Sequence, residues 1–109
     1  MNIWGNDWKK YLKEISGTES PPEMKRPHAH HMVEKVGGKQ AGQLNRMLLS
    51  EAGIDPLLSK HNLTWAPNVA GPHGYAPQLE LFKKLIVVRR DRNGILNVLR
   101  EQREVSTSK

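Results

Sequence analysis

A helical pattern between two short extended segments is the feature that most limits the fold of this chain. In residues 39–53, KQAGQLNRMLLSEAG, apolar side chains repeat at helical spacing and Gly53 fits the position after the last turn. Residues 30–36 (HHMVEKV), which end at Gly37-Gly38, and residues 62–68 (NLTWAPN) are the strand candidates. The helical face expected to be buried consists of Ala41, Leu44, Met47 and Leu48. The pattern therefore predicts a mainly helical α+β fold with two short strands.

Three further helices complete the expected layout. Residues 4–15 form an amphipathic helix that stops at Gly17, and a Pro-rich linker follows it. Another helix begins at Pro77, and a final helix, ILNVLREQREV, begins after a break at Asn93-Gly94. The apolar positions of the first and third helices include Trp4, Trp8, Tyr11, Leu12, Ile15, Leu79, Phe82 and Ile86.

The composition limits the chemistry. A chain of 109 residues is long enough for one compact domain, in which residues 1–26 form the N-terminal helix and linker and residues 27–109 the main body. The absence of cysteine excludes disulfides and thiolate sites, so a metal site must use His, Asn, Asp or Glu. We expect no transmembrane helix and no signal peptide. A net charge of +6 favours a polyanionic partner such as nucleic acid.

Three of the five histidines lie within the stretch HAHH, of which the first, His28, is expected to be a solvated loop residue. Neighbouring side chains on a strand point to opposite faces, so His30 and His31 would diverge. This favours a division of labour, in which one imidazole binds a metal and the other takes a proton from water. Further ligands would come from Asn62 and His73 in turn-like segments, with water and phosphate oxygens completing the shell.

Basic side chains are candidates for holding phosphate groups. The nucleic-acid-binding candidates are Lys35, Lys39, Lys60, Arg89 and Arg90. A simpler interpretation of such residues is a solvated surface, because most runs of charge have no ligand.

Four elements, in order, resemble the AHH nuclease toxins of the HNH and endonuclease VII superfamily: AHHMV, AGQLNRMLLSEAGID, NLTWAP and GPHGYAPQLELFKKL. The resemblance covers residues 27–86. It implies a ββα-metal core with short strands and flanking helices, and a metal-dependent endonuclease that hydrolyses phosphodiester bonds in DNA. The chain departs from the family pattern at Leu63 and Ala66, where Gly and Leu are usual, and it has one downstream histidine where many relatives have two.

The resemblance implies a role for each site residue. His30 is expected to be a metal ligand, and His31 the general base that activates water. Asn62 is expected to bind the metal or to orient the site, and His73 to complete the metal or phosphate contacts. The expected cofactor is one divalent ion, either Mg, Mn, Ni or Zn, which stabilises the charge on the transferring phosphate.

The resemblance also implies a biological setting. Such domains usually form the C-terminal end of large secreted bacterial toxins that act in the cytoplasm of a target cell during bacterial competition. The expected partners are therefore DNA and an acidic immunity protein that masks the basic site, and no membrane.

Two other hypotheses stay open from the sequence. One is an RNase toxin with the same site. The other is a catalytically inactive module that binds nucleic acid or protein and uses its histidines structurally. A chelator separates catalytic from structural metal, because a structural zinc module loses its fold when the metal is removed.

Overall fold

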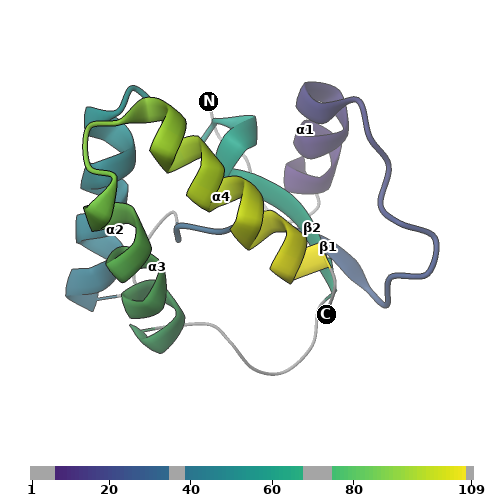
Figure 1. Ribbon diagram of the computed structural model, residues 1–109. Helices are drawn as coiled ribbons and strands as arrows, with labels where there is room; N and C mark the ends of the chain where they lie inside the picture. The colour runs from purple at the N-terminus through teal and green to yellow at the C-terminus, as the bar shows by residue number, and fades with distance from the viewer. Residues whose placement is uncertain (1–6, 35–38, 68–74, 108–109) are drawn as a thin grey trace.

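The chain forms four helices and a two-stranded antiparallel sheet within residues 7–34, 39–67 and 75–107, which the computed structural model describes (Figure 1). In chain order the elements are α1 (Asp7–Ser16), β1 (Pro27–His31), α2 (Lys39–Glu51), the 3-10 turn η1 (Lys60–Asn62), β2 (Leu63–Pro67), α3 (Tyr75–Val87) and α4 (Arg92–Thr107). The expected class, mainly helical α+β with two short strands, is confirmed. Within these residues, no helix combines the length and the hydrophobicity needed to cross a bilayer.

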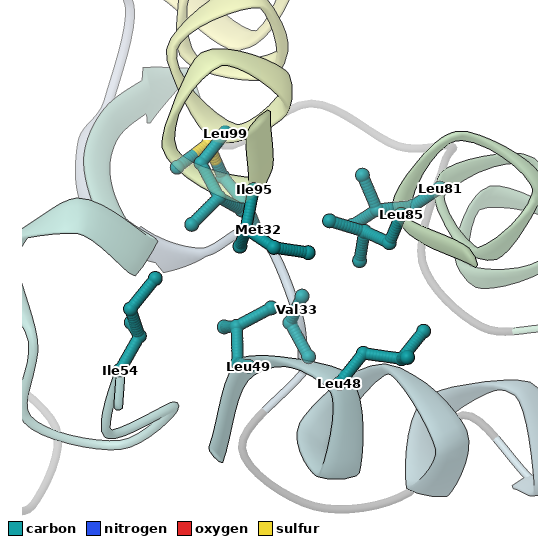
Figure 2. Close-up of a cluster of buried hydrophobic side chains, with 9 residues drawn as sticks. All are labelled: Met32, Val33, Leu48, Leu49, Ile54, Leu81, Leu85, Ile95 and Leu99. Carbon is teal, nitrogen blue, oxygen red and sulfur yellow. The ribbon is translucent and has the colours of Figure 1, made fainter. Parts of the chain in front are cut away.

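The larger hydrophobic cluster, here called the helical core, lies between α2, α3, α4 and the segment after β1 (Figure 2). Its buried members are Met32, Val33, Leu48, Leu49, Ile54, Leu81, Leu85, Ile95 and Leu99. Burial of a side chain of this size stabilises the fold by about 1.5–3 kcal/mol before the loss of conformational entropy is counted. Because the core includes the two residues that directly follow β1, it fixes the end of that strand.

The first strand begins earlier and ends earlier than expected. The apolar pair Met32-Val33 suggested a strand over residues 30–36, but β1 spans Pro27–His31. Both apolar side chains turn into the helical core instead of continuing the alternation of a strand. The second strand lies within the expected segment.

The buried faces of α2 and α3 are also rotated from the expected ones. Met47 is exposed, whereas α2 buries Ala41, Gly42, Asn45, Leu48 and Leu49. In α3, Ile86 is exposed and Gln78 is buried. The expected faces consist of apolar residues alone, whereas Asn45 and Gln78 form a buried polar contact between the two helices.

Glycine and aspartate set the helix boundaries. The ends at Gly17 (φ +68°) and Gly53 (φ +78°) are confirmed, and both residues adopt the left-handed conformation that favours glycine. The expected break at Asn93-Gly94 is wrong, because both residues lie inside α4. Asp91 caps this helix instead, and its Oδ1 atom accepts a hydrogen bond from the Gly94 N–H at 3.1 Å.

A smaller cluster, here called the aromatic cluster, packs α1 on one face of the sheet. Trp8 and Leu12 of α1 bury Leu63 and Trp65 of β2. The alternating residues of β2, including the buried Thr64, point to the opposite face, and β2 also contacts α4. The N-terminal helix is therefore part of the packed fold.

Candidate functional site

Strand β1 carries its histidines on two faces of the sheet. In the antiparallel register, His30 lies opposite Thr64 and His31 lies opposite Leu63. Since Leu63 packs against α1, His31 points to the α1 face and His30 to the other face. His31 is 7% exposed, whereas His30 is only partly buried. The expected divergence of the adjacent pair is confirmed.

The His31 ring is held by two contacts. Its Nε2 atom lies 2.9 Å from the backbone oxygen of Leu57. The Trp8 ring packs against it edge to face, with centroids 4.6 Å apart and planes at 87°. A carbonyl oxygen only accepts hydrogen bonds, so in the neutral imidazole Nε2 carries the hydrogen and Nδ1 carries the lone pair. This tautomer makes Nδ1 the basic atom of the ring.

The turn at residues 55–58 presents three consecutive carbonyl oxygens to three side chains. Asp55 fixes the turn, because its Oδ1 atom accepts hydrogen bonds from the N–H groups of Leu57 (2.8 Å) and Leu58 (3.2 Å). The carbonyls of Pro56, Leu57 and Leu58 contact Asn62 Nδ2, His31 Nε2 and Tyr11 Oη respectively. The turn thus connects η1, β1 and α1.

Asn62 is fully buried, and its side-chain amide forms hydrogen bonds with backbone groups. Its Oδ1 atom accepts from the Val33 N–H at 2.7 Å, and Nδ2 donates to the Val33 oxygen at 2.8 Å and to the Pro56 oxygen at 2.7 Å. Its backbone oxygen accepts from the Met32 N–H at 3.0 Å. These bonds extend the pairing of β1 beyond the sheet. Of its two expected roles, they favour orienting the site over binding a metal.

One buried polar pair, Asn45 and Gln78, is not predicted in the sequence analysis. Gln78 Nε2 donates to the Met32 oxygen at 3.0 Å, and Asn45 Nδ2 donates to both the side chain (3.1 Å) and the backbone oxygen (2.8 Å) of Gln78. The segment after β1 is thereby tied to α2 and α3. The sequence feature that indicates burial of Asn45 is its spacing, because Asn45 lies one helical turn from both Ala41 and Leu49 on the buried face.

His28 shares a face of β1 with His30. The expectation of a solvated loop residue is wrong, because His28 is a partly buried strand residue opposite Ala66. The two imidazole rings have centroids 5.8 Å apart and planes at 71°. Over residues 7–34, 39–67 and 75–107, no group of three or more His, Asp or Glu side chains is arranged to hold a metal. The expected ligand His73 lies outside the described residues.

One group of basic residues lines a pocket beside β2. The pocket, of about 480 Å³, is bordered by the end of α1, the following linker, η1, β2 and Arg103 of α4. Lys60 and His61 lie on its wall, and Arg103 donates to the carbonyls of both at 3.3 and 3.2 Å. Burial lowers the pKa of His61, and the charges of Lys60, Arg103 and Arg92 lower it further. Lys60 and Arg103 therefore give one wall of the pocket a positive charge, and the carboxylate of Glu19 also lines the pocket.

The other basic candidates lie elsewhere. Arg89 forms an ion pair with Glu51 at 2.8 Å, and Arg90 lies 4.0 Å from the same carboxylate. The Arg89 hydrogen bond lowers the pKa of Glu51. In Figure 1 the turn between α3 and α4, which carries both arginines, lies at the opposite end of the molecule from β1. Lys39 is exposed at the start of α2, and Lys35 lies outside the described residues.

Comparison of the chain with known protein families, with curated proteins and with solved structures finds no match. The chemistry of the site therefore follows from its own groups. These are a buried histidine whose tautomer is set by a carbonyl, and two partly buried histidines on the opposite face of the same strand.

Proposed function

We propose that this protein is a metal-dependent endonuclease that hydrolyses phosphodiester bonds in DNA. The observation that carries the proposal is the contact between His31 Nε2 and the Leu57 carbonyl. In the tautomer that it selects, Nδ1 is the basic nitrogen and is the atom proposed to take a proton from water. In the resulting imidazolium, the Nε2 hydrogen bond to the carbonyl is charge-assisted and therefore stronger. The carbonyl partner thus both orients the base and stabilises its protonated form.

His30 is the proposed metal ligand at the neighbouring position. Two imidazole-bearing residues on one face of β1 fit a borderline transition metal such as zinc or nickel better than magnesium, which prefers oxygen ligands. A bound divalent ion supplies stabilisation of the negative charge that develops on the phosphate and the leaving oxygen. Asn62 holds the end of β1 in place through its bonds to Val33.

The charge of the chain supports a polyanionic substrate. The net charge is +6, and the pocket beside β2 combines Lys60, His61 and Arg103. Binding through phosphate contacts weakens steeply with salt and carries little base specificity. Delivery within a larger secreted toxin and inhibition by an acidic immunity protein belong to the same proposal, and RNA is the alternative substrate.

The burial of His31 favours a second candidate, a nucleic-acid-binding module without catalysis. A ring that is 7% exposed and packed against Trp8 has the surroundings of a structural histidine in a protein core. In this case His31 stabilises the packing of α1 on the sheet, and the basic pocket supplies all of the nucleic-acid affinity.

Cleavage of supercoiled plasmid and of structured RNA by the purified chain tests the proposal. Reactions contain Mg²⁺, Mn²⁺, Ni²⁺ or Zn²⁺, or EDTA, and compare the wild type with His31→Ala, His31→Gln and Val87→Ala, a control at an exposed position of α3. We expect metal-dependent nicking that falls about 100-fold or more in both His31 variants and persists in Val87→Ala. Circular dichroism shows whether each variant folds. Absence of cleavage by folded wild-type protein with every metal would reject the nuclease and favour the binding module.

A further inference from the structure

We propose that His28 and His30 together form a divalent transition-metal site on the face of β1 opposite α1. The inference rests on the proposed function for the catalytic purpose of the ion, but not for its binding. It assigns to His28 a ligand role that the resemblance does not supply. It also answers the question of which protein group joins His30, since the Asn62 amide is already bonded to Val33 and Pro56.

The geometry of β1 carries this proposal. Residues two apart on a strand point to the same face, so His28 and His30 lie side by side. Their ring centroids are 5.8 Å apart. With metal–nitrogen bonds of about 2.0–2.1 Å, two imidazoles that share one ion have centroids roughly 5–6 Å apart. The observed spacing therefore fits a shared ion without a change of the strand.

The residues directly opposite the two rings on β2 are uncharged. The cross-strand partners of His28 and His30 are Ala66 and Thr64, which are small and carry no charge. The turn between α3 and α4, which carries the arginines that pair with Glu51, lies at the opposite end of the molecule from β1 (Figure 1). The residues directly across the sheet therefore add no positive charge at the histidine pair, whereas Lys60 and Arg103 line the pocket that Thr64 borders.

The strand is also held rigidly, which lowers the entropy lost when the ion binds. One edge of β1 pairs with β2, and the residues that follow His31 are fixed by Asn62 and Gln78. Two imidazoles leave several coordination positions for water and phosphate oxygens. Nitrogen donors of this kind predict tighter binding of Ni²⁺ and Zn²⁺ than of Mn²⁺, and the weakest binding of Mg²⁺.

Calorimetric titration of the full chain with ZnCl₂, NiCl₂ and MgCl₂, without nucleic acid, tests the site. The proteins are wild type, His28→Ala, His28→Gln, His30→Ala and the control His61→Ala. We expect one ion per chain, an affinity that falls about tenfold or more in each variant of His28 or His30, and no change in His61→Ala. Zinc affinity equal to that of the wild type in a folded His28 variant would overturn the proposal.

A second measurement needs no variant. Proton NMR of the wild-type chain with substoichiometric Ni²⁺ should broaden the ring signals of His28 and His30 before those of His31 and His61. Broadening that spares His28 would overturn the site. Plasmid cleavage separates this inference from the proposed function: metal binding through His28 without any cleavage rejects only the nuclease. Cleavage with a His28 variant of unchanged metal affinity rejects only the site.

Discussion

The two faces of β1 carry the same residue type in opposite environments. On one face, His31 lies under Trp8 with Nε2 bonded to the Leu57 carbonyl. On the other face, His28 and His30 are partly buried beside each other. A single strand of five residues thus carries both a histidine fixed by its packing and the pair that we propose to bind an ion. The comparison teaches that the chemistry of a histidine in HAHH depends on the element that packs on its face of the sheet.

The largest expected effect comes from the removal of Trp8, the α1 side chain that packs against His31. Trp8→Ala should lower the free energy of unfolding by about 3–5 kcal/mol, because it deletes a large buried ring from the aromatic cluster. Zinc affinity should stay within about twofold, since His28 and His30 lie on the other face. Urea unfolding and zinc titration check both values, and Trp8→Phe is the control with a smaller loss. A folded Trp8→Ala protein that no longer binds zinc would show that the faces are coupled.

Asn62→Ala tests whether both faces depend on the same anchor. The change leaves the Val33 N–H without its side-chain acceptor and the Val33 and Pro56 carbonyls without their donor in a buried region, so we expect a loss of about 3 kcal/mol. Lys60→Ala, two residues away and exposed, should change stability by less than about 0.5 kcal/mol. Chemical denaturation measures both. A loss below about 1 kcal/mol for Asn62→Ala would contradict the anchoring role.

Alanine substitutions of His31 and of His30 test the difference between the two faces of β1 directly. His31→Ala should lower the free energy of unfolding by about 2 kcal/mol, because it removes a buried ring and its hydrogen bond, whereas His30→Ala should cost less than about 1 kcal/mol. Zinc affinity should respond in the opposite order. Thermal unfolding and calorimetry on the two variants provide the comparison. Equal effects on both properties would remove the distinction between the faces.

The smallest expected effect is the contribution of His61 to the pH dependence of stability. This residue lies in η1 and on neither face of β1. Its pKa is lowered first by burial and then by the charges of Lys60, Arg103 and Arg92, so the unfolded chain binds this proton more readily than the folded chain. The corresponding stability is present above the unfolded pKa of about 6.5 and is lost as the pH falls below it. His61→Gln should therefore lose less stability than the wild type between pH 7.5 and pH 5 in urea unfolding. A steeper loss in the variant would contradict the sign.

Helix boundaries and strand positions follow from local rules to different degrees. Gly17 and Gly53 mark helix ends correctly because a left-handed residue is a local requirement. Gly94 misleads, because it serves the close approach of α4 to Val88, where a Cβ atom at position 94 would lie 2.7 Å from the Val88 Cβ. A requirement that comes from packing between two segments is not visible in the local sequence pattern.

The candidate site shows the same division. The opposite orientation of His30 and His31 follows from strand alternation alone. The strand membership of His28 does not, because it depends on pairing with a segment nearly forty residues later. Likewise, the carbonyl partner of His31 is a backbone atom of Leu57, and the sequence pattern gives no indication of which carbonyl reaches a given ring.

The turn at residues 55–58 sets a limit on loop length. Three successive carbonyls meet side chains from η1, β1 and α1, so each carbonyl must stay in its place along the chain. Surface loops generally tolerate insertions well. An added or deleted residue between Asp55 and Ser59 would instead offer each side chain the wrong carbonyl. The connection between α2 and η1 therefore acts as a fixed-length spacer, and changes in chain length are better accommodated in the linker between α1 and β1.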